Sequence, residues 1–209
     1  MEKNIHRVVI LGGGSAGWLS AGIIAAEHCV GSTSTASGEG NSNGFQLVLV
    51  ESPDISTIGV GEGTWPSMRN TLKKIGISET EFFRECSASF KQGTLFSDWL
   101  GGETEAANDS YIHPFTIPQS YADTNLAPHW QLIRDQVKFA DAVCPQSSLA
   151  QGHQAPKKIS TPEYAFQLNY GYHLDAGKFA ELLRAHCVDN LGVVHIKANV
   201  QSINSADNG

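Results

Sequence analysis

The sequence lacks the marks of a nucleic-acid-binding, membrane-spanning or secreted protein. Its 209 residues carry 21 acidic and 14 basic side chains, and the basic ones form no cluster. This balance argues against nucleic acid or an anionic membrane surface as a main partner. No apolar run approaches the roughly 18 residues that a membrane-spanning helix needs, and the N-terminus has no secretory-signal pattern. We therefore expect a cytoplasmic protein that binds neither nucleic acid nor membrane.

Cysteine is scarce, and its spacing argues against the common metal and redox motifs. Cys29, Cys86, Cys144 and Cys187 lie far apart and form no CxxC pair. We interpret them as reduced, partly buried thiols and expect no metal site. The remaining composition, with 41% hydrophobic and 17% charged residues, is that of a globular protein with enough chain to bury a core.

The glycine pattern near the N-terminus is the clearest local motif. The apolar, β-branched run at 6–11 is typical of a buried parallel strand, and G-x-G-x-x-G follows it at the start of a helical pattern. Such glycines allow a tight turn, a close approach of pyrophosphate and close packing of helix on strand. The alternative is a glycine-rich turn without a ligand. The residues that we expect to contact a dinucleotide here are Gly12, Gly14, Ser15, Ala16 and Gly17.

An acidic residue after the second strand strengthens this prediction. The run at 45–51 is a good second strand that ends in Glu51, 34 positions after Gly17. The polar stretch at 31–44 is predicted to be a flexible insertion of 14 residues, and without it the spacing is the 20 residues expected for a ribose-binding carboxylate. A carboxylate at this position favours FAD or NAD over NADP, whose 2′-phosphate it would repel.

A second glycine-rich segment, at 59–63, is predicted to be a loop that exposes its backbone. We expect a helix from Pro66 to a stop at Gly76, and a capping box formed by Ser78 and Glu81 before the next helix. Glu62 is either a cofactor-loop carboxylate or simply exposed. The candidate cofactor-binding residues of the segment are Gly59, Val60, Gly61, Glu62 and Gly63.

The C-terminal part predicts one more helix and one more strand of the same sheet. Asp175 is a candidate N-cap for a helix with a buried stripe of Phe179, Leu182, Leu183 and His186, and the run at 193–203 is predicted to be a strand. The fold class is therefore α/β, with a parallel Rossmann-like sheet from strands near 6–11, 45–51 and 193–203.

Several stretches, taken in order, resemble one family, the flavin-dependent tryptophan halogenases. They are GGGSAGW (12–18), VLVES (48–52), IGVGEGTWP (58–66), FKQGTLFSDW (90–99), YIHPF (111–115) and YGYHLDAGKFAELLRAH (170–186). G-x-G-x-x-G is shared by many flavoproteins, whereas GVGEGTWP with a downstream FKxG is more specific. The resemblance implies an FAD/NAD(P)-binding fold of the flavin monooxygenase and halogenase type.

The resemblance also implies a reaction. FAD, delivered in its reduced form by a separate flavin reductase, would react with oxygen and a halide ion to give hypohalous acid. The matching lysine here is Lys91, which would hold the electrophilic halogen beside an aromatic substrate such as tryptophan or indole. Local sequence alone would leave Lys91 a solvated surface lysine. Trp65 is interpreted as packing, with a substrate or flavin contact as the alternative, and His113 and His173 as structural.

The family pattern also includes parts that this sequence does not contain. The family carries a W-x-W-x-I-P motif and a glutamate partner of the lysine in its second half, and neither is matched here. We therefore expect an N-terminal portion of a halogenase-like protein, with a fold that is incomplete at the C-terminus and little activity when isolated. A homodimer is left open.

These observations predict a division of the chain. Residues 1–76 and 170–209 are expected to form the FAD-binding part, and 77–169 a mixed segment that carries Lys91 and part of a substrate or cap region. Two alternatives to the halogenase remain, a single-component flavin monooxygenase and a non-catalytic FAD-binding relative. A monooxygenase has no need of Lys91.

Overall fold

The structure is a computed structural model that describes residues 5–28, 45–55, 61–98 and 110–205. Within it the chain divides into two compact units. The first unit comprises 1–62, 71–88 and 174–209, and the second comprises 63–70 and 89–173. None of the described helices has the length and apolarity to cross a bilayer.

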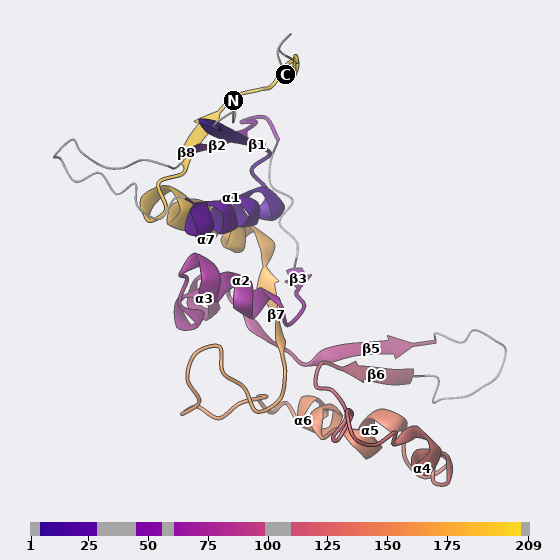
Figure 1. The fold of residues 1–209 in the computed structure, drawn as a ribbon. Helices are drawn as coiled ribbons and strands as arrows, with labels where there is room; N and C mark the ends of the chain where they lie inside the picture. Colours follow the sequence, from indigo (N-terminus) through magenta and orange to yellow (C-terminus); the bar gives the residue numbers. More distant parts are fainter. Residues whose placement is uncertain (1–4, 29–44, 56–60, 99–109, 206–209) are drawn as a thin grey trace. The chain divides into compact units, whose positions relative to one another are not determined.

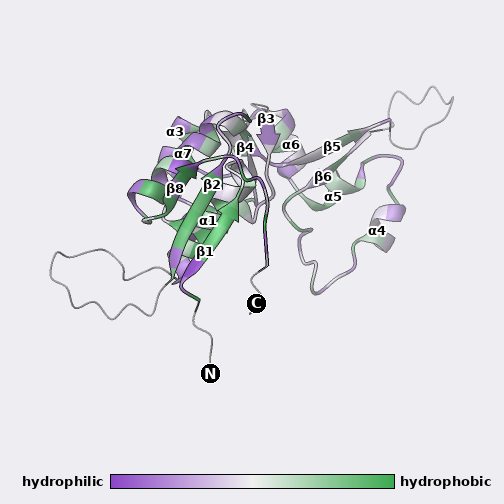
Figure 2. Ribbon diagram, turned by 90° about the horizontal axis from the view of Figure 1, so that it is seen from above, coloured by the Kyte–Doolittle hydropathy of each residue, from purple (hydrophilic) through white to green (hydrophobic). Residues whose placement is uncertain are grey.

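The first unit contains a three-stranded parallel sheet, with the helices of the unit on one side of it (Figure 1). Its strands are β1 (Arg7–Leu11), β2 (Gln46–Glu51) and β8 (Val194–Lys197), in the order β1-β2-β8. The apolar character of β1 and β2 is plain in Figure 2, and Leu49 in the middle strand is fully buried. This confirms the predicted α/β class and parallel sheet.

The third strand is shorter than the sequence predicts. It ends at Lys197, which pairs with Glu51, and the bond from the Ala198 N–H to the Glu51 carbonyl, at 2.9 Å, is its last link to β2. Because β2 itself ends at Glu51, the apolar residues after 198 have no ladder to continue. The prediction of a strand to 203 was therefore wrong at its C-terminal end.

Two long helices cover one face of this sheet (Figure 1). They are α1 (Ser15–His28) and α7 (Ala176–Asp189). They approach closely because α1 turns small residues toward α7. A methyl group added at Gly22 would lie 3.4 Å from the Cys187 sulfur. Trp18 is the large side chain of this interface and is only 1% exposed.

The predicted cap of α7 is confirmed, and its predicted stripe only in part. The Asp175 carboxylate accepts the Lys178 backbone N–H at 2.9 Å. Phe179 and Leu183 are buried as expected. The buried residues of this helix include Cys187 but not His186. His186 lies at the edge of the stripe, and its Nε2 forms a hydrogen bond with the Ile75 carbonyl at 2.7 Å.

Two shorter helices follow the predicted signals, except that the first begins at Met68, two residues after the predicted start at Pro66. Helix α2 (Met68–Ile75) ends at Gly76, whose φ of 86° is the left-handed conformation of a glycine stop. Helix α3 (Glu79–Glu85) begins after Ser78, whose hydroxyl accepts the Glu81 N–H at 3.4 Å.

The second unit contains shorter elements. A second sheet has the order β3-β7-β4, with β3 (Gly61–Gly63), β7 (Gly171–Asp175) and β4 (Ser89–Lys91). Strands β5 (Gly93–Ser97) and β6 (Ser110–Pro114) pair antiparallel. Three short helices follow, namely α4 (Ala127–Gln131), α5 (Phe139–Val143) and α6 (Gln146–Gln151). Residues 61–63 are therefore a short strand and not the loop that their glycines predict.

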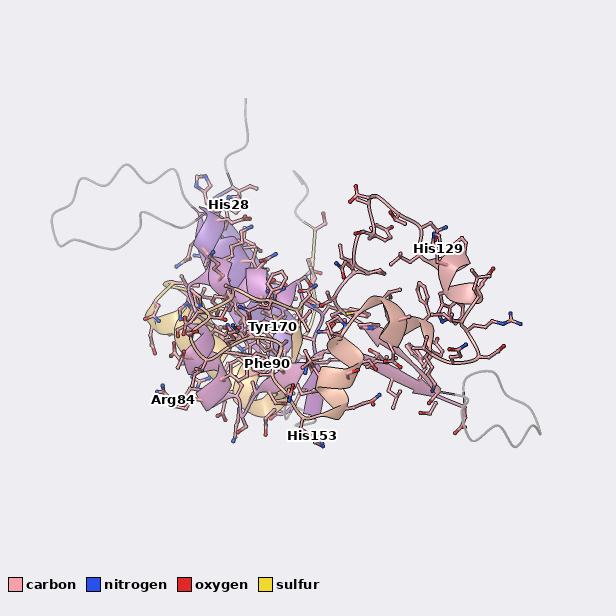
Figure 3. All side chains as sticks on the ribbon, turned by 90° about the horizontal axis from the view of Figure 1, so that it is seen from below. His28, Arg84, Phe90, His129, His153 and Tyr170 are labelled. Carbon is pink, nitrogen blue, oxygen red and sulfur yellow. The ribbon has the colours of Figure 1, made fainter. Side chains whose placement is uncertain are left out.

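An aromatic cluster and a buried arginine hold the second unit together. Phe90 and Tyr170, both labelled in Figure 3, belong to this cluster. Their rings meet edge to face with centroids 4.9 Å apart. Arg69 lies with its guanidinium over the Tyr170 ring and donates to the Tyr170 and Tyr164 carbonyls, each at 3.1 Å, and to the Asn169 side chain. A single side chain thus ties down the segment that leads into β7.

The described cysteines are free thiols. Cys86, Cys144 and Cys187 are buried and unpaired, as predicted. Burial raises the pKa of the Cys86 and Cys187 thiols to about 12, so both stay protonated and unreactive at neutral pH. Cys29 and the insertion at 31–44 lie outside the described residues.

Candidate functional site

The glycine turn between β1 and α1 has the geometry that each glycine was predicted to provide. Gly12 takes a φ of 116°, and its N–H donates to the Val50 carbonyl at 2.9 Å. A methyl group at Gly17 would lie 2.0 Å from the Gly12 carbonyl oxygen, so only glycine permits this packing. At Gly14 nothing lies within 4 Å of such a methyl, which leaves the backbone open to a ligand.

This turn forms one wall of a cavity of about 870 Å³ in the first unit. Six of the residues predicted to bind cofactor line the cavity. They are Gly12, Gly14, Ser15, Ala16, Glu51 and Glu62. Gly17 acts behind the wall through its packing, and Gly59 and Val60 lie outside the described residues.

Sequence reasoning missed other residues of the same wall. Gly13 lies inside the motif, and Ser52 and Asn199 follow the ends of β2 and β8. The Ser52 hydroxyl donates to the Asn199 amide oxygen at 2.5 Å. The signal that could have found them is topological, because the carboxyl ends of parallel strands converge on one ligand crevice.

The Glu51 carboxylate is held at the end of β2. Its Oε2 accepts a hydrogen bond from His195 Nε2 at 2.8 Å, and its side chain is 23% exposed. On the other side it lies against the glycine turn, because a methyl group at Gly13 would be 2.2 Å from the Glu51 carboxyl carbon. The carboxylate therefore borders the place where a nucleotide backbone would approach.

The residues of this cavity fit a dinucleotide of the FAD or NAD type. The start of α1 supplies free N–H groups and the positive end of the helix dipole for a pyrophosphate. The open space beside Gly14 leaves room for that group, and Glu51 lies within the same cavity as a ribose acceptor.

Lys91 lies in the second unit at the end of β4, paired with Gly171 of β7. Its Nζ is 5.9 Å from the centre of the Trp65 ring and 5.6 Å from that of Phe115. No carboxylate in the described part of the chain pairs with it. Lys91 is half-buried, and its amine lies beside two aromatic rings.

The Lys91 side chain lies close to Gly63. A methyl group at Gly63 would lie 2.9 Å from Nζ, so the end of the lysine side chain would have to shift to make room for it. His173 lies on the same face of the β4–β7 pair, because its cross-strand partner is Ser89. Partial burial and the Lys91 charge lower the pKa of His173.

A large apolar cavity of about 920 Å³ lies in the same unit. Trp65 and Phe115, the two rings nearest the Lys91 amine, line it, and their centroids are 5.5 Å apart. Other side chains of its wall are Leu95, Tyr111, Ile112, Trp130 and Phe139. Trp65 is 61% exposed and lines this cavity, so it does not belong to the buried core.

Two polar side chains, one half-buried and one buried, bond to the backbone at Phe115 and Thr116. The Asn169 side-chain amide donates to the Phe115 carbonyl at 3.0 Å, and the Phe115 N–H donates to the Gln92 carbonyl at 3.0 Å. Gln146, which is fully buried, accepts the Thr116 N–H at 2.8 Å. This part of the cavity wall is rigid, and nothing in the local sequence pointed to Asn169 or Gln146.

Comparison with known proteins identifies the family of the chain that carries these two sites. The family model described as tryptophan halogenase matches residues 7–209. The chain belongs to the tryptophan halogenase family. The resemblance predicted from the sequence motifs is thus confirmed.

Individual relatives agree with the family. The chain is 30% identical to the tryptophan 6-halogenase ThaL of Streptomyces albogriseolus and 27% identical to the tryptophan 7-halogenase RebH of Lentzea aerocolonigenes. Each match covers the whole of this chain and 39% of the relative. The chain therefore spans well under half the length of these halogenases.

Solved structures of the family share the fold. A tryptophan halogenase from Shewanella frigidimarina is 48% identical, with a TM-score of 0.87 over 100% of this chain and 39% of that one. Xcc4156, a flavin-dependent halogenase from Xanthomonas campestris, is 30% identical, with a TM-score of 0.76 over 98% of this chain and 37% of that one. The FAD/NAD(P)-binding, Rossmann-type fold predicted for the N-terminal region is thereby confirmed.

Proposed function

We propose that the full-length protein is an FAD-dependent halogenase of an aromatic small molecule such as tryptophan or indole. The observation that carries the proposal is the placement of Lys91. Its amine lies against Trp65 and Phe115, which line an apolar cavity of about 920 Å³, in a chain of the tryptophan halogenase family.

The first unit would hold the cofactor. The N–H groups at the start of α1 would bind the FAD pyrophosphate beside Gly14, and Glu51 would accept a hydroxyl of the adenosine ribose. Glu62 and the segment 59–63 complete the proposed cofactor-binding residues. Bound reduced FAD would supply hypohalous acid from oxygen and chloride or bromide, with its electrons delivered by a separate flavin reductase.

Lys91 would direct this oxidant. Hypohalous acid is diffusible and unselective. Either the amine nitrogen bonds to the halogen while the oxygen–halogen bond breaks and water leaves, or the ammonium donates a hydrogen bond that polarises the acid. Both modes hold the electrophile at one point against the ring to be halogenated, which is catalysis by positioning.

The apolar cavity would bind the aromatic substrate. Its wall combines the tilted rings of Trp65 and Phe115 with the edge-to-face pair of Trp130 and Phe139, and a small number of charged side chains also line it, as in many small-molecule sites. A flat aromatic ring would face Trp65 and Phe115, the same two rings that border the Lys91 amine. This shared border brings the proposed substrate and the proposed halogen carrier together.

The test is product analysis on the full-length protein supplied with a flavin reductase, oxygen, bromide or chloride, and tryptophan. We expect a halogenated product by mass spectrometry, and a loss of at least about a hundredfold in Lys91→Ala, the scale of a lost catalytic group. Lys157→Ala is the matched control, because Lys157 also lies over an aromatic ring, but that ring, Tyr170, does not line the cavity.

Other outcomes would replace the proposal. FAD binding without a halogenated product from any aromatic substrate would indicate a non-catalytic FAD-binding protein. Oxygenated product with NAD(P)H and no separate reductase would indicate a single-component monooxygenase. Full activity in Lys91→Ala would remove the proposed role of the lysine.

A further inference from the structure

The Glu51 carboxylate needs a fixed orientation if it is to select a ribose. A glutamate side chain is flexible and loses rotamer freedom when it binds. In this chain Glu51 is the last residue of β2, at the edge of the cavity, and is 23% exposed. A second group that held the Glu51 carboxylate in place before the ligand binds would reduce this loss of side-chain entropy.

His195 is placed to hold it. His195 pairs with Leu49 in the β2–β8 ladder, so the side chains of His195, Leu49 and Glu51 share one face of the sheet. His195 is 13% exposed, and its Nε2 lies 2.8 Å from Glu51 Oε2. Because a carboxylate only accepts hydrogen bonds, Nε2 carries the proton and donates.

The histidine ring is itself fixed from the helix layer. Trp18 meets it edge to face, with ring centroids 5.0 Å apart and an interplanar angle of 74°. Trp18 belongs to α1, and its carbonyl accepts the Cys187 thiol of α7 at 3.6 Å. The orientation of His195 is thus set by the buried contact of α1 with α7.

The second carboxylate oxygen faces the glycine turn. A methyl group at Gly13 would lie 2.5 Å from Glu51 Oε1, and both residues line the nucleotide cavity. With Oε2 engaged by His195, Oε1 is the oxygen left to accept a ribose hydroxyl. Oε2 thus anchors the side chain, and Oε1 would accept the hydrogen bond from the ligand.

We propose that His195 is a positioning residue that holds Glu51 for recognition of the adenosine ribose, with Trp18 fixing the histidine ring. This inference rests on the proposed FAD binding. It gives β8 a part in ligand selection, although His195 itself does not line the cavity.

The test compares ADP with 2′-deoxy-ADP, which lacks the hydroxyl that Glu51 would read. Calorimetry on the full-length wild type should show ADP binding about tenfold tighter, the scale of one hydrogen bond to a charged group. His195→Phe keeps a ring against Trp18 but removes the donor, and should reduce that preference to about twofold. His195→Gln keeps an N–H donor and should retain most of it.

Val194→Ala is the matched control, because Val194 lies on the same strand but is exposed on the other face. It should keep the wild-type preference. Glu51→Gln should lower the preference and make the effect of His195→Phe disappear in the double variant. If His195→Phe does not fold, His195→Met, which also lacks a donor, takes its place.

The two proposals fail separately. A wild type that binds neither FAD nor ADP would overturn the proposed cofactor site, and the role of His195 with it. A wild type that binds ADP, with an unchanged preference in His195→Phe and in His195→Met, would overturn the role of His195 alone.

Discussion

The two candidate sites of this protein are built in opposite ways. The nucleotide cavity is lined mainly by three short segments at the carboxyl ends of the parallel strands β1, β2 and β8, at 11–16, 50–52 and 198–200. The apolar cavity beside Lys91 draws on residues from Trp65 to Gln151, carried by short strands, short helices and irregular connections. The first kind of site can be found from a local motif, whereas the second exists only after folding.

The physical reason lies in the sheet. Parallel strands deliver their carboxyl ends to one edge, so a glycine turn after β1 and a carboxylate after β2 must meet. In the second unit no such rule applies. Lys91 meets Trp65 and Phe115 because Asn169 and Arg69 fix the segments around them.

The largest expected effect is a loss of product formation when the wall of the apolar cavity is changed. Phe115→Ala removes one of the two rings beside the Lys91 amine and opens the cavity wall. We expect product formation in the full-length protein to fall by about a hundredfold through misplacement of the substrate, with unchanged FAD affinity. Tyr121→Ala, on an exposed side chain that does not line this cavity, should retain activity. An active Phe115→Ala would separate the cavity from the chemistry.

Arg69→Met should destabilise the second unit by about 2–3 kcal/mol, because it leaves the Tyr164 and Tyr170 carbonyls and the Asn169 side chain without their buried donor. Arg69→Lys should recover little of the lost stability, because one ammonium group cannot make the three hydrogen bonds that the planar guanidinium donates in different directions. Urea unfolding monitored by tryptophan fluorescence measures the change. A wild-type midpoint in Arg69→Met would show that the segment is held by other contacts.

A matched pair of glycines tests the first unit. Gly17→Ala would push a methyl group into the Gly12 carbonyl and should cost about 1–3 kcal/mol of stability. Gly14→Ala meets open space, so it should fold normally and lose only affinity for FAD. Thermal unfolding and FAD titration of both variants separate the two roles. Equal losses of stability would contradict the assignment.

The smallest effect concerns pH. Burial, and then the charge of Lys91, lower the pKa of His173 below its ordinary value of 6.5. Because the unfolded chain binds this proton more tightly, the stability that His173 contributes above pH 6.5 is lost as the pH falls through its folded-state pKa. His173→Gln should flatten the decline of the melting temperature below that pH, whereas the exposed His129→Gln should leave it unchanged. Parallel profiles for all three proteins would show no such coupling.

The sequence predicted the first unit better than the second. The turn glycines, the parallel strands, the helix start at Ser15 and the cap at Asp175 follow from local chemistry, and the structure shows each of them. The strand after 198 failed because its ladder partner ends at Glu51, and the predicted loop at 61–63 is a strand.

The residues that sequence reasoning missed depend on distant pairing. His195 is 144 positions from Glu51, and only the register of β8 brings them together. No local sequence pattern distinguishes Lys91 from a surface lysine, and only the family resemblance makes it a candidate. The sequence motifs do include Trp65 and the YIHPF stretch, which ends in Phe115. No sequence pattern predicts, however, that these two rings lie beside the Lys91 amine.

The most direct test of the central claim, that the two units carry separate tasks, is the FAD affinity of Lys91→Ala in the full-length protein. We expect a dissociation constant within about twofold of the wild type, together with the loss of halogenated product from the same preparation. A tenfold or greater loss of FAD affinity would contradict it, because Lys91 would then belong to the cofactor site and not to the aromatic cavity.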